Sequence, residues 1–311
     1  MSETELAVEM ENKEIQEALS ELGKLEKGFA GVELDHLRRK EFDLKPLYAK
    51  RTEILQKIPD FWPTVFLNAP QDIVQHYSER DLEFLASIRS FSVERYQIKS
   101  HDSGEPRSLR FIFEFAPNEL FTDTKLIKEF EYVSNSDGAG DLISTPVPIK
   151  WKSKKKDLTD GLLDAAVDLY RAEQSMTLKK SGKSVAMVDR EGLWQHEKLR
   201  ELIEKVEESA EEPSIALWFG FRGAVARDQE SKSAGANVFP AGEEVAISLA
   251  EDLWSDAIDY FMRTDQDDGP DLADLDDADE DSSEDDSDNA PALVSAGGAN
   301  VDRPAKKRRT G

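Results

Sequence analysis

Residues 11–58 carry the pattern of one long helix: ENKEIQEALSELGKLEKGFAGVELDHLRRKEFDLKPLYAKRTEILQKI. Apolar residues recur at a heptad spacing with charged residues between them, which is typical of a coiled-coil face. The phase of the repeat slips at Gly28–Gly31. The apolar residues on the two sides of this slip are Ile15, Leu22, Leu25, Phe29 and Val32, then Leu37, Leu44, Tyr48, Leu55 and Ile58.

A lone helix with this stripe would expose too many leucines to water, so it needs a partner. The partner is either a second copy of the chain or the rest of the same chain. A helix of this length would span about 70 Å, which favours the second copy. Gly23, Gly28 and Gly31 each cost roughly 1 kcal/mol relative to alanine inside a helix. Pro46 lacks a backbone donor and is expected to kink the second half.

The chain after the helix predicts an α+β domain with a four-stranded antiparallel sheet. Leu109, Phe111, Phe113 and Phe115 alternate with other residues and mark a clear half-buried strand. Further strands are expected at 91–101, 125–133 and 145–151, with a loop at 134–144. No helical pattern separates these strands, which indicates an antiparallel sheet. Helices expected to cover one face lie at 79–90, 162–176, 194–206 and 246–261.

The segment Asp265–Asp288 is strongly acidic. It holds 14 Asp or Glu residues and no Lys or Arg, within a chain of net charge −25. Such a segment cannot bury enough apolar surface to offset the entropy of ordering, so we expect residues 265–311 to be a disordered tail. Its negative potential suits a basic partner and disfavours DNA or RNA as the main ligand.

The remaining composition indicates a soluble intracellular protein. Cysteine is absent, which excludes disulfides, thiol nucleophiles and thiolate metal sites. No apolar stretch is long enough to span a bilayer, and the start of the chain, MSETELAVEMENK (1–13), is too acidic for a signal or transit peptide. Residues 1–10 are expected to be a flexible N-terminus. A basic cluster near the C-terminus predicts nuclear import and comprises Lys306, Lys307, Arg308 and Arg309.

Catalysis is not expected. The four histidines are scattered, and the Gly-Lys-Ser of residues 182–184 lacks the first glycine and the strand of a phosphate-binding loop. We therefore predict no cofactor, no metal and no enzyme activity. The basic run Lys150–Lys156 is read first as the solvated end of a strand, with an import signal or a DNA contact as alternatives.

Acidic residues gather before the tail, on and near the last expected helix. Alone they would be the polar face of an amphipathic helix, but their position next to the 14 carboxylates of Asp265–Asp288 favours a continuous acidic surface. These residues are Glu243, Glu244, Glu251, Asp252, Asp256 and Asp259.

Several motifs in one order resemble the nucleosome assembly protein family, within it the SET/template-activating-factor-I branch. The similarity covers most of 12–158 and resumes at about 213–270. The strongest pieces are KPLYAKRTEILQKIPDFWPTVFLNAP (45–70), RFIFEFAPNELFTDTKLIKEFEY (110–132), IKWKSKKKDLT (149–159) and EDLWSDAIDYF (251–261). Residues 160–212 resemble an insertion, and Asn118-Glu119-Leu120-Phe121 departs from the family's Asn-Pro-Tyr-Phe.

The resemblance implies a homodimer joined by the long helix of residues 11–62, with an "earmuff" domain at 63–264 whose acidic underside binds histones. By the same resemblance the histone-binding carboxylates include Asp157 and the residues from Glu243 to Asp259, and the tail adds Asp265, Asp267 and Asp268. Which kind of core histone pair is preferred stays open.

We therefore expect a homodimeric histone chaperone that acts in nucleosome assembly and disassembly on chromatin. We expect it in the nucleus, with shuttling to the cytoplasm left open, and without membrane binding or sequence-specific nucleic-acid binding. One alternative is a regulatory adaptor that inhibits a phosphatase or modulates a histone-modifying enzyme. Another is a chaperone of other basic proteins, whose charge resembles that of histones.

Overall fold

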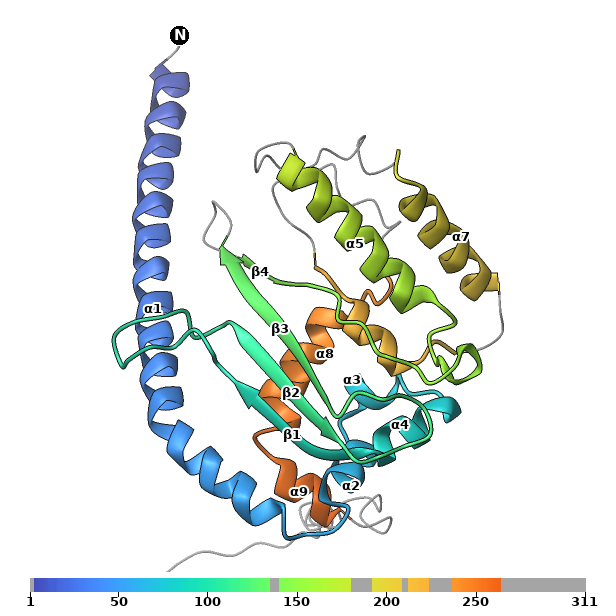
Figure 1. Cartoon of the computed structure of the whole chain (residues 1–311). Helices are drawn as coiled ribbons and strands as arrows, with labels where there is room; N and C mark the ends of the chain where they lie inside the picture. Colours follow the sequence, from blue (N-terminus) through green and yellow to red (C-terminus); the bar gives the residue numbers. More distant parts are fainter. Residues whose placement is uncertain (1–2, 135–139, 180–191, 209–211, 224–236, 264–311) are drawn as a thin grey trace, which may run out of the picture. The chain divides into compact units, whose positions relative to one another are not determined.

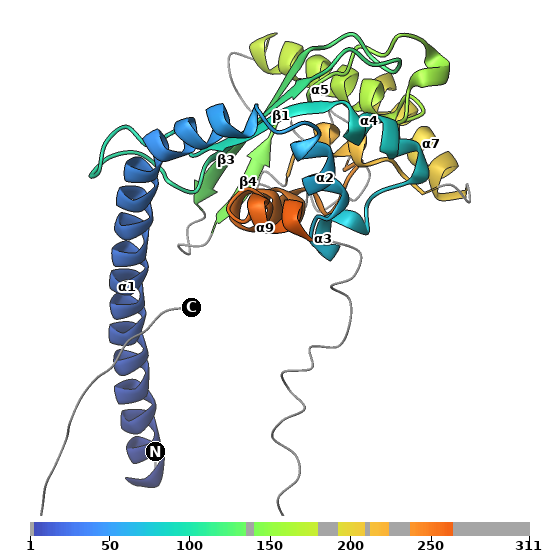
Figure 2. The same ribbon diagram turned by 90° about the horizontal axis from the view of Figure 1, so that it is seen from below.

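The computed structural model describes residues 3–134, 140–179, 192–208, 212–223 and 237–263 (Figure 1). Its first element, α1, is one continuous helix over Glu3–Leu55 that includes Pro46. The helix runs unbroken through Gly28 and Gly31, so the phase slip at these glycines does not interrupt it. Figures 1 and 2 show α1 bending in the part that contains Pro46, as expected, while its N-terminal part projects away from the domain.

The sheet has the order β1-β2-β3-β4 with antiparallel neighbours, which confirms the expected sheet type. Its strands are β1 (Ile88–Glu94), β2 (Leu109–Phe115), β3 (Lys125–Ser134) and β4 (Gly140–Ser144). The prediction for the last strand was wrong, because β4 lies before residues 145–151. Pro146 and Pro148 lack the backbone N–H that a strand ladder requires. Val147 instead donates its N–H to the carbonyl of Phe219 at 2.8 Å.

The helix expected at 79–90 is shorter than predicted. A 3-10 turn, η1 (Glu79–Asp81), leads into α4 (Leu82–Ala86), and β1 begins at Ile88. The hydroxyl of Ser87 donates to the carbonyl of Phe84 at 2.7 Å, a local bond that competes with continuation of the helix. Leu82, on α4, is 54% exposed, whereas Leu85 on the same helix is buried.

Aromatic residues fill the core on one face of the sheet. The alternating residues of β2 are buried there, and helices α2 (Phe61–Leu67) and α8 (Gly242–Ser248) lie on the same face (Figure 1). Trp62 of α2 lies 5.3 Å from Phe91 between ring centroids, and Trp218 lies 5.2 Å from Phe111. Such edge-to-face contacts stabilise more than their buried area alone. The short helix α3 (Gln71–Val74) and the 3-10 helix η3 (Ile215–Gly220) complete this layer.

A buried lysine crosses from the sheet to this layer. The Lys128 ammonium, on β3, donates to the carbonyls of Thr145 at 2.8 Å, Phe219 at 3.0 Å and Phe221 at 2.6 Å. Burial and the nearby Arg222 lower the pKa of Lys128 well below its ordinary value. The three carbonyls oppose that shift because they accept hydrogen bonds from the charged form. Lys128 therefore joins β3 to the chain around η3.

The remaining helices agree in part with the sequence. The 3-10 turn η2 covers Lys154–Lys156, and α5 (Leu162–Lys179) and α7 (Trp194–Glu208) are confirmed and pack together. The helix expected at 246–261 is divided into α8, a π-helical turn η5 (Leu249–Leu253) and α9 (Ala257–Met262). Within the described ranges, no helix combines the length and the apolar character that a membrane span requires.

Candidate functional site

The acidic residues before the tail lie on one helical segment, residues 242–262. Glu243 and Glu244 begin α8, Glu251 and Asp252 belong to η5, and Asp259 belongs to α9, with Asp256 at its N-cap. Figure 2 shows α8 and α9 on the side toward which the N-terminal part of α1 extends. The structure therefore brings this predicted group together on one helical segment.

Four of these carboxylates face solvent. Glu244, Glu251, Asp256 and Asp259 are exposed, whereas the opposite side of the same segment is buried in the core. That buried side comprises Val245, Ala246, Leu249, Ala250, Leu253, Trp254, Ala257 and Tyr260. A rigid core thus fixes the four exposed carboxylates in place, and their like charges produce a local negative potential.

Glu243 is bound within the structure. Its Oε1 accepts the backbone N–H of Leu142 at 3.0 Å, at the outer edge of β4. Burial raises the pKa of the Glu243 carboxyl, and Asp141 and Glu244 raise it further, while the Leu142 bond partly opposes them. Glu243 therefore closes a sheet edge, which sequence reasoning assigned to no residue.

Two other carboxylates have partners on neighbouring elements. Asp252 accepts a hydrogen bond from the Tyr260 hydroxyl at 2.6 Å. Burial first, and then Asp252, raise the pKa of Tyr260 to about 12. Glu251 forms an ion pair with Arg95 at 3.1 Å, although 59% of its side chain remains exposed. The exposed part of Glu251 can thus contact a partner, while the carboxylate of Asp252 is occupied by its hydrogen bond from Tyr260 of α9.

Asp157 does not join the acidic face. It is buried, and its carboxylate accepts the N–H groups of Thr159 at 2.8 Å and Gly161 at 2.9 Å. These bonds close a turn in which Asp160 and Gly161 have positive φ angles of 51° and 85°. The structure therefore gives Asp157 a role in the turn before α5 and does not support client contact by this residue.

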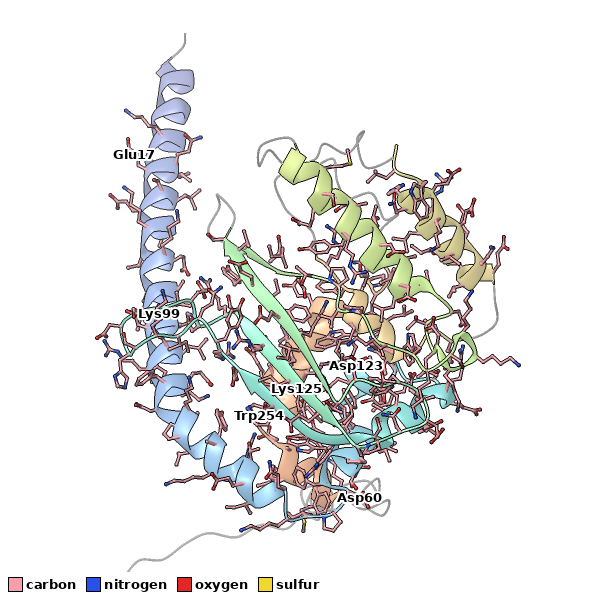
Figure 3. The ribbon with its side chains drawn as sticks, in the orientation of Figure 1. Glu17, Asp60, Lys99, Asp123, Lys125 and Trp254 are labelled. Carbon is pink, nitrogen blue, oxygen red and sulfur yellow. The ribbon has the colours of Figure 1, made fainter. Side chains whose placement is uncertain are left out.

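No sequence pattern indicates the contact that joins α1 to the acidic segment. The Arg51 guanidinium donates to the carbonyls of Trp254 at 2.8 Å and Ser255 at 3.3 Å. It lies 4.0 Å from the centroid of the Trp254 ring, a cation–π contact, and Tyr48 lies beside both. Figure 3 labels Trp254 between the end of α1 and the sheet. The orientation of α1 is thus coupled to η5.

The apolar stripe of α1 divides into two parts. The first part is 51–70% exposed and comprises Ile15, Leu22, Leu25, Phe29 and Val32, to which the structure adds Leu19. Leu47 and Ile54 are exposed to a similar extent, and Ile58, just beyond the helix, is 37% exposed. Along the described part of the chain, nothing covers this stripe.

The other predicted seam residues face their own domain. Leu55 is buried in the core and Tyr48 packs against that core, so neither is available to a second copy. Leu37 and Leu44 are half-buried. The β1–β2 loop lies along this part of α1 (Figure 1). It is held there by Arg38 to the Gly104 carbonyl at 2.8 Å and by Asp43 to His101 at 2.8 Å.

The basic run Lys150–Lys156 is mostly exposed but anchored at its start. Thr122 donates its N–H to the Lys150 carbonyl at 3.0 Å, and Lys150 pairs with Asp123 at 3.6 Å. In the preceding turn, the Asn118 side chain accepts the N–H groups of Leu120 and Phe121. The turn that departs from the family motif is therefore closed by its own asparagine.

Other predicted residues lie outside the described ranges: Asp265, Asp267, Asp268, Lys306, Lys307, Arg308 and Arg309. Among the described residues, no group of three His, Cys, Asp or Glu side chains is placed to hold a metal ion. A cavity of about 300 Å³ lies between the end of α1 and the start of β1, and Leu55, Phe61 and Ile88 line it.

Comparisons with known proteins point to one family. A family model described as nucleosome assembly protein matches residues 6–264. NAP1-related protein 2 of Arabidopsis thaliana is 33% identical over 153 residues, which cover 49% of this chain and 55% of that protein. Protein SET of Drosophila melanogaster is 37% identical over 114 residues, which cover 36% of this chain and 39% of that protein. The matched part thus spans about half or less of these relatives.

The fold also has a counterpart among solved structures. The crystal structure of Vps75 matches with a TM-score of 0.53 and 18% identity, covering 79% of this chain and 97% of that chain. At this level of identity the match concerns the arrangement of helices and strands.

Proposed function

Because this chain belongs to the nucleosome assembly protein family, we propose that it is a histone chaperone that binds core histones and supports nucleosome assembly and disassembly. The observation that carries the proposal is the set of carboxylates fixed on the solvent side of residues 242–262. The function requires no chemical step, so the proposal assigns the protein no enzyme activity.

The proposed mechanism is competition between two anions. Histone Lys and Arg side chains exchange DNA phosphates for the carboxylates of Glu244, Glu251, Asp256 and Asp259. Each exposed ion pair contributes only about 0–1 kcal/mol, so affinity requires many pairs at once. The acidic tail supplies more charge, while the folded face adds a fixed shape that a free polyanion lacks.

A second copy of the chain is the proposed partner of α1. The exposed stripe from Ile15 to Val32 is uncovered along the described part of the chain, and burial against an identical helix would remove it from water. A homodimer would carry two acidic faces. The basic cluster Lys306–Arg309 supports import into the nucleus, where such clients are assembled.

The test is titration of a core histone pair with the triple variant Glu244→Gln, Asp256→Asn and Asp259→Asn. Loss of three exposed charges should weaken binding about tenfold. A matched control removes three exposed charges from α7 through Glu197→Gln, Glu201→Gln and Glu208→Gln. This control should change affinity by less than about twofold, since its charges lie on another element.

Equal weakening in both variants would mean that net charge alone decides binding, and the acidic face would be rejected as the site. No binding of core histones by the unmodified protein near physiological ionic strength would reject the function itself. Urea denaturation of each variant checks that the fold is retained.

A further inference from the structure

The last helix exposes large apolar side chains among its carboxylates. Ile258 is 52% exposed and Met262 is 68% exposed. They are four residues apart on α9, so they are neighbours on its surface. The core is already supplied by the opposite side of the helix, where Ala257 and Tyr260 are buried. The fold therefore does not require apolar residues at these two positions.

A third exposed side chain lies at the same end of the domain. Leu67, at the end of α2, is 53% exposed, and α2 packs on α9. The next residue, Asn68, donates its side-chain amide to the carbonyls of Tyr260 at 2.9 Å and Arg263 at 3.3 Å. These bonds hold the end of α2 beside the end of α9. We call Leu67, Ile258 and Met262 the α9 patch.

Acidic side chains border the patch. Asp259 belongs to α9 and Asp256 is at its N-cap, both are exposed, and Glu251 precedes them on η5. Protein interfaces commonly place apolar residues at the centre and polar residues at the rim. A partner that fits this arrangement has apolar side chains surrounded by Lys and Arg.

We propose that the α9 patch receives the apolar face of a basic amphipathic helix of the client. This inference rests on the proposed function, and it adds that the client site recognises more than charge. The proposed ligand of the patch is a helix of a core histone pair. Basic side chains beside the apolar face of that helix would contact Asp256 and Asp259.

Charge argues against a second copy of this chain as the occupant. A symmetric contact through the patch would bring the same patch from both copies together. Asp256 and Asp259 of one copy would then face their counterparts, and like charges in a dehydrated contact repel. A basic partner turns the same charges into attraction.

The two kinds of contact respond differently to salt. The Debye length falls from about 10 Å at 0.1 M salt to about 3 Å at 1 M, so salt weakens the ionic contacts of the rim. Salt does not screen the burial of Ile258 and Met262, because that contact is apolar. If the client contacts both the carboxylates and the α9 patch, part of its affinity should remain at high salt, because salt screens only the ionic contacts.

The experiment compares the full-length protein with its Ile258→Ser/Met262→Ser variant, using a core histone pair and poly-lysine as probes. Poly-lysine has the charge of a client without its apolar face. The variant should bind the histone pair about tenfold more weakly at about 0.1 M and at about 1 M salt. Its affinity for poly-lysine should be unchanged. Leu82→Ser, which alters a 54% exposed leucine on α4, is the matched control and should leave both affinities unchanged.

Each other outcome is informative. Unchanged histone affinity in the double variant overturns the proposal, as does an equal loss for histones and poly-lysine. A change in the mass of the free protein would assign the patch to contact between copies and would also overturn it. If the unmodified protein binds poly-lysine but no histones, the proposed function fails first, before the patch is tested.

Discussion

Single carboxylates in this protein do different work although the sequence presents them as one group. Asp157 closes a turn, Glu243 caps the edge of β4, and Asp252 accepts from Tyr260. Glu244, Asp256 and Asp259 remain exposed. Sequence spacing predicts which helix or strand carries a residue. It does not show that the carboxylate of that residue accepts a hydrogen bond from a backbone N–H far away in the chain. The distinction decides which substitutions test binding and which disturb the fold.

Glu243 offers one such test. Glu243→Gln keeps an acceptor for the Leu142 N–H and removes a charge beside Asp141 and Glu244. Glu243→Ala removes the acceptor and should lower the free energy of unfolding by about 1 kcal/mol. Urea denaturation at neutral pH should therefore find the glutamine variant at least as stable as the unmodified protein. A glutamine variant as unstable as the alanine variant would show that the charge is required.

The pH dependence of stability follows from the same group. The folded-state pKa of Glu243 is raised above its ordinary value of 4.5, so the folded state binds its proton more tightly than the unfolded state. The stabilisation is complete below the ordinary pKa and is lost as pH rises through the raised folded value. Glu243→Gln should remove this slope between pH 4.5 and the raised value, and denaturation midpoints across that window measure it.

Substitution of Lys128 should lower the free energy of unfolding more than substitution of Glu243 does. Lys128→Met leaves three buried carbonyls without their donor and should cost about 2–4 kcal/mol of unfolding free energy. Lys125, on the same strand, has a 48% exposed side chain and pairs with Glu114 at 3.3 Å. Lys125→Met should therefore cost less than about 1 kcal/mol. Equal losses in urea denaturation would contradict a specific role for Lys128.

Helices and strands with a regular apolar repeat could be predicted from the sequence. Helices and strands whose ends depend on prolines or on local hydrogen bonds could not. The alternation of β2 and the stripe of α1 define these elements because apolar spacing reports a buried or paired face. β4 was missed because Pro146 and Pro148 were included in an apparent strand. The π turn η5 was missed because the apolar spacing across it resembles that of an α-helix. The acidic residues of 242–262 are close in sequence and therefore could be placed on one segment from the sequence, whereas Arg51 depends on a partner 203 residues away.

The stripe of α1 continues on the side that the domain leaves open. Leu47 lies 25 residues after Leu22, and Ile54 lies 25 residues after Phe29, in each case about seven helical turns. Each pair therefore shares one side of the helix axis. Leu55 and Tyr48 lie on the side that faces the core. The proposed pairing face is accordingly narrower than the sequence pattern indicates.

A double variant tests that face. Leu22→Glu with Phe29→Glu places charges in the exposed stripe and should weaken self-association about 100-fold or more. Light scattering should then give a mass of 35.0 kDa at concentrations where the unmodified protein has twice that mass. Ser20→Glu alters an exposed residue on the opposite side of the same turns and should leave the mass unchanged. A monomeric unmodified protein would contradict the pairing role of α1.

At the scale of the whole molecule, charge is divided between the folded domain and the tail. Removing residues 265–311 deletes the 14 carboxylates of Asp265–Asp288 and Asp302, together with the basic C-terminal cluster. Histone affinity should fall and its salt dependence should become shallower, but binding should persist because the face on residues 242–262 remains. A tail of scrambled order and equal composition should restore the full affinity. Complete loss on truncation would assign the client site to the tail alone.

The Arg51 contact with Trp254 has a mechanical consequence. It ties the end of α1 to the helix that carries the acidic face, so the two cannot swing independently of one another. In a pair of chains joined through α1, the length of this helix would set the distance between the two acidic faces. A client that contacts both faces would have to match that distance. Lengthening α1 by whole turns would change the size of client that can bind both faces.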